Sequence, residues 1–398
     1  MLAKFLTRSV FSCIGLTLVA SGCEKQQTTP PPSDPVATAP AKPPAKPIPD
    51  GFFTLTPQLT VNDVDAAIAF YTTALGAQKL FTLPGADGKT MHGEIKIGDS
   101  IVMIDAENPQ GKSPLTLGGT PATLMVYVEK VDEAYAAAIA AGAKQEQPVQ
   151  DQFWGDRYGE LSDPFGHRWA LATHTEDLTP EQMQQRSALV MAEMAPPPKG
   201  KRKKKPKKGA PPVWKAVAGT PATQAVPAPY HTVTVAYTLD DAAAAIEFYK
   251  TALGAQERDR MAMPDGRIMH AEISIGDSFL MLSDEMPGMS KSAKTLAGSP
   301  VALMLYTPDV DAAMTTATGA GGTAVMPVSD MFWGDRYGAI VDVAGYLWGI
   351  ATHKEDLTPE EIAERAKAAM PPAAAETAPA PAAAPAGTET AAAPTPAS

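Results

Sequence analysis

The stretch QFWGDRYGELSDPFGHRWALATH, residues 152–174, returns almost intact as MFWGDRYGAIVDVAGYLWGIATH, residues 331–353. In its first occurrence, residues 154–159 (WGDRYG) are typical of a tight hairpin. A turn at residues 163–166 (DPFG) follows, and the apolar run 169–173 then predicts a strand. The repeated stretch therefore predicts a β-hairpin followed by a closing strand.

The repetition extends over most of the chain. Tyr71 matches Tyr249 at an offset of 178 residues, and Trp154 matches Trp333 at an offset of 179, which indicates a tandem duplication with one extra residue in the second copy. Each copy begins with an alternating strand, at 56–61 and 234–239, followed by an amphipathic helix. The helix of the first copy is expected to begin after the N-cap Asp63 and to end at Gly76. The helix of the second copy is expected to begin after Asp240 or Asp241 and to end at Gly254.

The rest of the first copy predicts more strands and a second helix. Strands are expected at 78–83, 91–97 and 100–105, the last two joined by a turn at Gly98-Asp99. A strand at 122–128, a helix at 131–141 capped by Gly142, and three more strands repeat that plan. Each copy thus predicts two βαβββ modules, and the fold class is α+β.

The N-terminus has the layout of an export signal. Lys4 and Arg8 precede an apolar run at 10–20 that is short for a membrane span. The following Ala20-Ser21-Gly22-Cys23 resembles the lipobox of bacterial lipoproteins, which predicts removal of residues 1–22 and acylation of Cys23. Glu24, rather than aspartate, follows the cysteine, which resembles lipoproteins that are sent to the outer membrane. This resemblance predicts a location facing the periplasm or the cell surface. The alternative is an ordinary signal peptide that leaves Cys23 as a thiol.

Composition separates folded segments from tethers. The chain has 39 prolines in 398 residues, and the two cysteines, at 13 and 23, leave no disulfide for the repeated parts. The predicted organisation is a signal peptide (1–22), a Pro/Thr-rich tether (23–50), a first domain (51–177), a helix (178–195), a basic linker (196–228), a second domain (229–356), a helix (357–370) and a disordered Ala/Pro tail (371–398). Each of the two helices is expected to pack on its own domain.

The order of elements and four motifs carry a family resemblance. The helix end FYTTALGA (70–77), the WGDRYG hairpin and the DPFGHRW turn resemble the vicinal oxygen chelate superfamily, which includes glyoxalase I, bleomycin-resistance proteins and extradiol dioxygenases. MHAEISIGDSFLMLSDE (269–285) is most similar to its PhnB-like branch. The resemblance covers residues 52–177 and 230–356. It implies two glyoxalase-like domains in which paired modules form a curved-sheet cup, with pairing inside each copy favoured.

The resemblance also implies where a metal would be held, by His, Gln or Glu on the first and last strands of each module. The corresponding positions here are Thr56, Met103, Thr123 and Ala170 in the first copy, and Thr234, Met281, Ala302 and Gly349 in the second. These side chains offer neither imidazole nor carboxylate to a divalent ion. No cofactor is therefore expected, with a divalent metal as the alternative.

Strand alternation predicts the cup lining, because side chains two residues apart share a face. With the motif residues Trp154, Arg157, Trp333 and Arg336, the candidate ligand-binding residues are Thr56, Gln58, Met103, Thr123, Met125, Tyr127, His174, Thr234, Met281, Met304, Tyr306 and His353. Such a lining suits an uncharged or aromatic small molecule held by shape and a few hydrogen bonds.

Three features leave alternatives open. His92 and Glu94, like His270 and Glu272, share a strand face and form either a displaced metal site or a polar rim. The Trp-Gly-Asp-Arg motifs resemble the pocket mouth of bleomycin-resistance proteins or form a clamp in which Arg157 pairs with Asp156 or Asp163. His174 and His353 are either functional or hydrogen-bonded strand ends.

A cluster of basic residues lies between the domains of a chain whose net charge is −11. An anionic envelope surface would attract it, whereas the alternative is a solvated spacer, and no nucleic acid is expected for an exported protein. The cluster consists of Lys199, Lys201, Arg202, Lys203, Lys204, Lys205, Lys207 and Lys208.

The sequence favours a lipid-anchored envelope protein that binds a small molecule in metal-free cups. One rival is a metal-dependent lyase, isomerase or dioxygenase with atypical ligands such as His92, Glu94 and His174. Another is an interaction protein with vestigial cups, in which the basic linker docks on the envelope.

Overall fold

A computed structural model describes residues 45–194 and 211–369 of the chain. The signal peptide, Cys23, the basic cluster and the Ala/Pro tail lie outside these residues. The first copy contains β1 (Leu55–Val61), α1 (Val64–Leu75), β2 (Gln78–Pro84), β3 (Thr90–Ile97), β4 (Ser100–Ala106), α2 (Pro114–Leu117), β5 (Ala122–Tyr127), α3 (Val131–Ala140), β6 (Lys144–Asp151), β7 (Asp156–Ser162) and β8 (Arg168–His174).

The second copy repeats this order after a connecting segment. That segment contains β9 (Glu176–Asp177), α4 (Pro180–Met194), η1 (Val213–Ala216) and β10 (Thr220–Pro221). The second copy contains β11 (Val233–Leu239), α5 (Ala242–Leu253), β12 (Gln256–Ala262), β13 (Ile268–Ile275), β14 (Ser278–Asp284), α6 (Ala293–Leu296), β15 (Val301–Tyr306), α7 (Val310–Gly319), β16 (Thr323–Asp330), β17 (Asp335–Val341) and β18 (Leu347–His353), and α8 (Pro359–Ala369) follows. The predicted α+β fold of paired βαβββ modules is confirmed.

Local signals placed most element boundaries correctly. Asp63 caps α1 by accepting a hydrogen bond from the amide of Ala66, and Gly76 ends the helix in the left-handed conformation. In the second copy the N-cap is Asp241 rather than Asp240. The C-cap of α3 is Ala141, one residue before the predicted Gly142.

The WGDRYG motif is divided between a turn and a strand, which corrects the prediction of a hairpin over all six residues. The amide of Gly155 donates to the carbonyl of Gln152, and β7 already begins at Asp156. Gly155 has φ +103°, and a Cβ there would lie 2.3 Å from the carbonyl oxygen of Glu176. Glycine is therefore required where the turn meets the chain that leaves β8.

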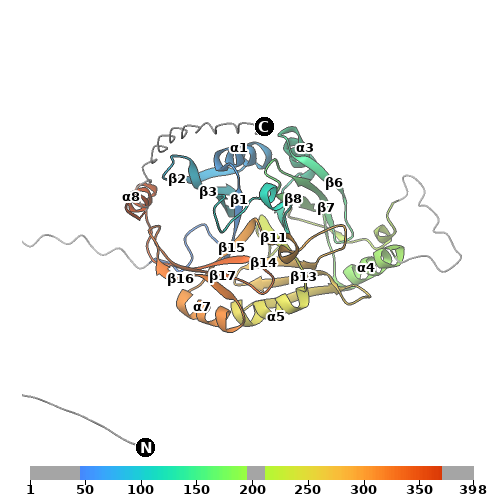
Figure 1. Ribbon diagram of the computed structural model, residues 1–398. Helices are drawn as coiled ribbons and strands as arrows, with labels where there is room; N and C mark the ends of the chain where they lie inside the picture. The colour runs from blue at the N-terminus through green and yellow to red at the C-terminus, as the bar shows by residue number, and fades with distance from the viewer. Residues whose placement is uncertain (1–44, 195–210, 370–398) are drawn as a thin grey trace, which may run out of the picture. The chain divides into compact units, whose positions relative to one another are not determined.

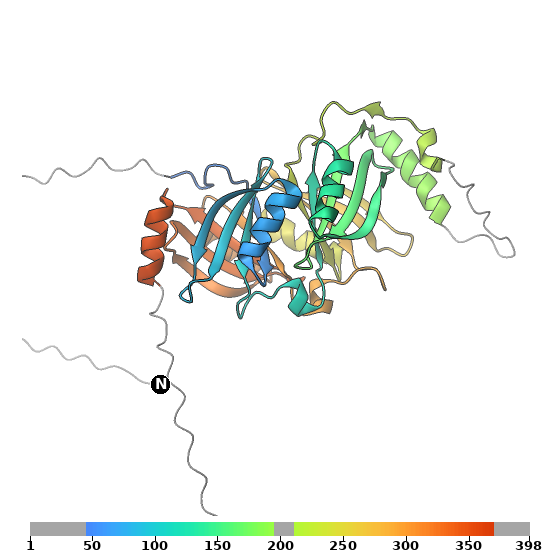
Figure 2. The ribbon, with the colours of Figure 1, turned by 90° about the horizontal axis from the view of Figure 1, so that it is seen from above.

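Two eight-stranded mixed sheets organise the described residues, and each takes one module from each copy. The first sheet has the order β16-β17-β18-β15-β1-β4-β3-β2, and the second β12-β13-β14-β11-β5-β8-β7-β6. In each sheet the two modules are joined at the centre by one antiparallel strand pair, β1 with β15 in the first sheet (Figure 1) and β11 with β5 in the second. In Figure 2 the blue strands of the first module lie beside the orange strands of the fourth.

This pairing corrects the expectation that the modules of one copy pair with each other. Within a copy the modules meet through their helices instead, α1 against α3 and α5 against α7. The backbone edge of β1 offers the same hydrogen-bonding groups to any module that approaches it. The local sequence pattern is therefore the same for either pairing.

Reciprocal contacts fix the two copies to each other. The amide of Thr232 donates to Asp99 and the amide of Thr54 donates to Asp277, each at 2.8 Å. Beside Thr232, Gly98 has φ +58° and no room for a Cβ. The internal symmetry of the sequence thus becomes an approximate twofold symmetry of contacts.

Most of the apolar side chains on the helix-covered faces of the sheets form one core. It includes residues of both copies, among them Leu59, Trp169, Tyr237 and Trp348. Two smaller apolar clusters lie on the opposite faces, one around Met304 and Tyr306 and one around Met125 and Tyr127. These opposite faces are the candidate sites. We call the one on the sheet of β1–β4 and β15–β18 cup A, and the one on the sheet of β5–β8 and β11–β14 cup B.

Candidate ligand-binding site

Cup A contains a cavity of about 560 Å³. Strands of the first and fourth modules line it, and α8, which lies at one end of the described chain in Figure 2, contributes Pro359 and Ile362. The segment before β1, residues 47–52, forms the strap of cup A. The rest of the lining comes from this strap, from the strands, from the turn before β17 and from the segment after β18: Pro49, Asp50, Phe52, Gln58, Leu80, Phe81, Leu83, Met91, His92, Glu94, Met103, Asp105, Met304, Tyr306, Phe332, Trp333, Asp335, Tyr337, His353, Asp356 and Leu357.

The first polar group of the cavity is centred on His92. Its Nδ1 lies 2.6 Å from Asp105, its Nε2 lies 3.7 Å from Glu94, and Gln58 donates a hydrogen bond to Asp105. Burial opposes protonation, but the hydrogen bond to Asp105 and the attraction of Glu94 outweigh it and raise the pKa of His92 to about 10. His92 is therefore a cation at neutral pH, held between two carboxylates.

The second polar group is centred on Asp335 at the start of β17. It accepts hydrogen bonds from Tyr306 and Trp333, and its Oδ1 lies 2.7 Å from His353 Nδ1. The second ring nitrogen of His353 lies 3.1 Å from Asp356. The hydrogen bond to Asp335 raises the pKa of His353 despite its burial. His353 is thus a hydrogen-bonded strand end that also lines the cavity.

Aromatic and sulfur-containing side chains supply the apolar part of the lining. Phe52 packs edge-on against Tyr306 with ring centroids 5.6 Å apart, and Trp333 packs edge-on against Tyr337 at 5.8 Å. Leu80 and Met91, also in the lining, have large exposed fractions of 45% and 41%. The cavity therefore joins an apolar interior to an apolar rim.

Cup B is covered by the chain's own strap, residues 225–230. Val226 and Tyr230 pack against Met125, Tyr127 and Ala172. The amide of His174 donates to the carbonyl of Ala225, and the hydroxyl of Tyr230 donates to Glu272. The predicted lining residues of cup B thus contact a segment of the chain itself.

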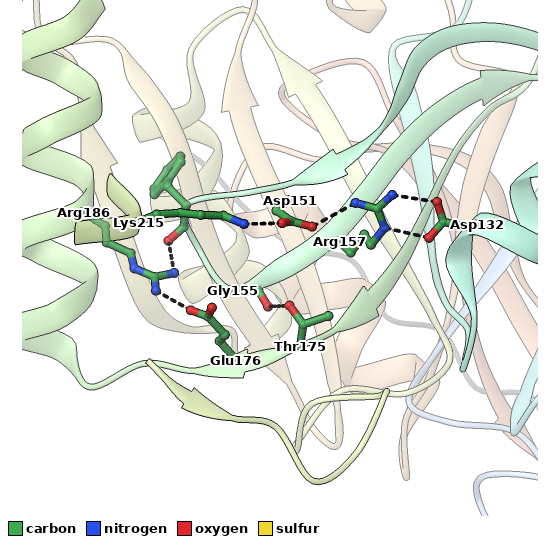
Figure 3. A network of polar contacts seen from close by, with 9 residues as sticks. Asp132, Asp151, Gly155, Arg157, Thr175, Glu176, Arg186 and Lys215 are labelled. Atoms are coloured by element: carbon green, nitrogen blue, oxygen red, sulfur yellow. Dashed lines mark hydrogen bonds and ion pairs between the residues drawn. The ribbon is translucent and has the colours of Figure 1, made fainter. Parts of the chain in front are cut away.

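The two arginines of the repeated motif bind the start of a helix and the preceding strand. Arg157 pairs with Asp132 at 2.6 Å and with Asp151 at 2.9 Å (Figure 3). Arg336 makes the same pair of contacts, with Asp311 and Asp330. The pairing of Arg157 with Asp156 or Asp163 is therefore corrected, while the clamp itself is present. Arg336 is not among the residues that line cup A.

The helix that follows each copy packs differently. In α4 the side chain of Arg186 is 1% exposed, and its guanidinium donates to Glu176 (Figure 3). The guanidinium also donates to the carbonyls of Phe153 and Val217 and lies over the ring of Trp214. In α8 the corresponding Arg365 forms an exposed pair with Glu355. A buried arginine anchors α4 beside cup B, and a looser contact holds α8 at cup A.

Exchange of modules redistributes the predicted site residues. Cup A brings together Gln58, Met103, Met304, Tyr306, Trp333 and His353 with His92 and Glu94. Thr56, Ala302 and Gly349 lie on the sheet of cup A. Trp154 is in the turn before β7, and the other predicted residues lie on the sheet of cup B: Thr123, Met125, Tyr127, Arg157, His174, Thr234, Met281, His270 and Glu272. The combination of His92 and Glu94 with His174 is thus not brought together, because β3 and β8 are in different sheets.

Within residues 45–194 and 211–369, no cluster of three or more His, Cys, Asp or Glu side chains has the geometry to hold a metal ion. The eight positions that the family resemblance marks for ligands carry Thr, Met, Ala or Gly. Their chemistry does not fit a hard or borderline divalent ion.

The strap and the helix residues of cup A were missed from the sequence. Phe52 and its counterpart Tyr230 stand at an offset of 178, just before the first strand of each copy. That spacing was a usable signal, because an aromatic residue at the same place in both copies matches the repeat. Leu357 and Ile362 also match apolar residues of the first copy, Leu178 and Met183, at an offset of 179, but the repeat could not show that they line a cup, because that depends on how α8 packs.

Comparisons with known proteins support this fold. The model of the Glyoxalase/Bleomycin resistance protein/Dioxygenase superfamily matches residues 54–171 and 231–350. The chain belongs to this superfamily and contains two of its domains in tandem.

Individual relatives match one copy or both. A protein of Mycobacterium bovis is 42% identical over 135 residues, which cover 33% of this chain and 89% of that protein. YjdN of Escherichia coli is 26% identical over 140 residues, 29% of this chain and 92% of its own. The solved structure of glyoxalase I from Zea mays has a TM-score of 0.52 at 16% identity and covers 79% of this chain and 94% of that chain, which shows a common fold.

No helix within residues 45–194 and 211–369 is both long and apolar enough to cross a membrane.

Proposed function

We propose that this chain is a lipid-anchored envelope protein that binds a small organic molecule in cup A and does not convert it. The observation that carries the proposal is the cavity of about 560 Å³, which is within the ~300–1,000 Å³ range of small-molecule sites. Its lining combines an apolar and aromatic surface with a few polar groups, as in sites that bind by shape.

The polar side chains of cup A already bind one another, which favours a binding function over catalysis. Asp335 accepts from two side chains and contacts His353, and His92 is held by Asp105. A general base near neutral pH needs a pKa close to the working pH, whereas the pKa of His92 is about 10. The absence of family-type ligands at the eight marked positions supports a metal-free site.

Metal content and ligand screening test this proposal. The chain carrying Cys23→Ser, which prevents acylation, is purified without chelators, offered Mn, Fe, Ni and Zn in turn, and analysed by mass spectrometry. We expect substoichiometric metal, and a stabilising ligand in a thermal-shift screen of aromatic small molecules. A tightly held stoichiometric metal together with turnover would contradict the proposal.

A metal-dependent lyase, isomerase or dioxygenase is the second candidate, because His92 and Glu94 face the same cavity. If this candidate is correct, His92→Ala abolishes metal uptake and His270→Ala in cup B does not. Uptake that is unchanged in His92→Ala would exclude it.

The cellular location belongs to the same proposal and is supported by the N-terminal sequence. We expect Cys23→Ser to move the protein from the membrane to the soluble fraction, with Cys13→Ser as the matched control that stays in the membrane. Attraction of residues 199–208 to anionic envelope lipids is tested with phosphatidylglycerol vesicles. Deletion of this segment should release the soluble Cys23→Ser chain from them, and unchanged binding would remove the linker's role.

A further inference from the structure

Because the sequence is duplicated, each residue of cup A can be compared with its counterpart in cup B. Phe52 in the strap of cup A corresponds to Tyr230 in cup B, Glu94 to Glu272, and Tyr306 to Tyr127. The straps are anchored alike: the amide of His353 donates to Pro47, and the amide of His174 donates to Ala225. Differences between the cups therefore show what each has gained or lost.

In cup B a tyrosine of the chain occupies the polar centre. The Tyr230 ring lies 4.9 Å from Phe279 and 6.1 Å from Tyr127, and its hydroxyl donates to Glu272. His270 is 3.6 Å from the same carboxylate. An aromatic ring with a hydrogen-bond donor thus satisfies the glutamate of cup B.

In cup A the same place is held by a ring without a donor. Phe52 packs 5.6 Å from Tyr306, as Tyr230 packs beside Tyr127, but it has no hydroxyl. Glu94 lines the cavity, and its ion-pair partner among the described residues is His92 at 3.7 Å, beyond hydrogen-bond length. The carboxylate of Glu94 therefore lacks, within the described chain, the donor that Glu272 has.

The charge of the lining indicates which charge the ligand of cup A can carry. Cup A is lined by the carboxylates of Asp50, Glu94, Asp105, Asp335 and Asp356, and among the described lining residues the only basic side chains are His92 and His353. No lysine or arginine belongs to the lining in this part of the chain. An anionic ligand would be repelled, whereas a neutral or cationic one is accepted.

We propose that Glu94 is the residue that selects the ligand of cup A, and that the ligand is an aromatic molecule carrying a hydroxyl or protonated amine donor. The donor takes up, from the cavity side, the interaction that Tyr230 makes with Glu272 in cup B. This inference rests on the proposed binding function of cup A and adds the chemical class of the ligand.

The test uses three probes with the same naphthalene body and calorimetric titration of the Cys23→Ser chain. The probes are 1-naphthylmethylamine, 1-naphthalenemethanol and 1-naphthylacetate. We expect the amine and the alcohol to bind at least tenfold more tightly than the acetate. Glu94→Gln should weaken the amine at least tenfold, because a charge-assisted hydrogen bond becomes a neutral one.

A strap substitution provides the matched pair. Phe52→Tyr places the chain's own hydroxyl beside Glu94 and should weaken the amine and the alcohol about tenfold, while Tyr230→Phe in cup B should leave both affinities unchanged. Equal affinity for all three probes, or affinities unaffected by Phe52→Tyr and Glu94→Gln, would overturn this inference alone. If none of the probes binds the unsubstituted chain, the proposed binding function of cup A is contradicted as well.

Discussion

The hydroxyl of Tyr71 on α1 donates a 2.7 Å hydrogen bond to Asp163, which lies 92 residues later in the turn before β8. Tyr71 and Asp163 belong to one copy but to modules in different sheets. Asp163 also accepts from the indole of Trp169 and from the amides of Phe165 and His167. One buried carboxylate therefore joins the helix motif to the turn motif, and Tyr249 with Asp342 does the same in the second copy.

Removal of the Tyr71 hydroxyl should destabilise the fold. Tyr71→Phe leaves a buried carboxylate with one donor fewer, which costs about 1–3 kcal/mol. Chemical denaturation should show a lower midpoint with an unchanged slope. Thr73→Ala on the exposed face of α1 is the control. If Tyr71→Phe unfolds at the same midpoint as the unsubstituted chain, the hydrogen bond does not contribute.

A single copy should form a dimer. In residues 45–194 alone, β1 and β5 would have no partner at their central edges, because β15 and β11 belong to the second copy. Two such chains can restore both pairings with each other, and Asp99 of each would then bind Thr54 of the other as Asp277 binds Thr54 here. Sedimentation should give twice the chain mass.

Asp99→Ala in this shortened chain should shift it toward monomer by removing that contact. Asp87→Ala, in the exposed turn between β2 and β3, is the matched control and should remain dimeric. A stable monomer of residues 45–194 would mean that the modules of one copy can pair by themselves.

The sequence predicted those features that depend on a residue and its near neighbours. Asp63 and Gly76 were correct helix caps because capping involves groups within one helical turn. Alternation placed Gln58, Met103, Met304 and Tyr306 on the cup faces because a strand fixes which face each side chain takes. These inferences did not depend on which modules pair.

The sequence did not predict features that depend on distant partners. Pairing of β1 with β15 could not be read from strands that are alike in both copies. For the same reason His174 was grouped with His92, although His353 is the histidine that shares the cavity with it. The anchoring of Arg157 by Asp132 required knowledge of where α3 begins relative to β7.

The stability contribution of His92 should decrease as pH rises. Its pKa is about 10 in the folded chain against 6.5 as the ordinary value, so the folded state holds a proton that the unfolded state releases. The contribution is complete below about pH 6.5 and is lost as pH rises toward and through 10. His92→Gln should therefore cost about 1.5–3 kcal/mol at pH 6, the value for hydrogen bonds to charged groups, and less at pH 10.

Denaturant unfolding at pH 6, 8 and 10 measures this difference. The matched control is His270→Gln, because Ser283 stands in cup B where Asp105 stands in cup A. Its cost at pH 6 should be smaller, since the carboxylate that holds His92 is replaced by a hydroxyl. A cost for His92→Gln that stays constant from pH 6 to 10 would contradict the assignment of a protonated His92.

The buried guanidinium of Arg186 should decide whether α4 stays packed beside cup B. It bonds Glu176 and two backbone carbonyls and stacks 5.0 Å over Trp214, so Arg186→Ala leaves these acceptors without a donor and removes the packing. We expect a loss of about 1–3 kcal/mol in the local stability of α4, the usual cost of leaving buried acceptors without a donor, because the carboxylate of Glu176 is 36% exposed and can be hydrated.

Amide hydrogen exchange of residues 180–193 should accelerate by roughly five- to a hundredfold, while β7 and β8 exchange as before. Arg365→Ala in α8 is the matched control, because its partner Glu355 is exposed and such pairs contribute ~0–1 kcal/mol. Equal acceleration of α4 and α8 in their respective variants would show that burial of Arg186 adds nothing to the packing of its helix.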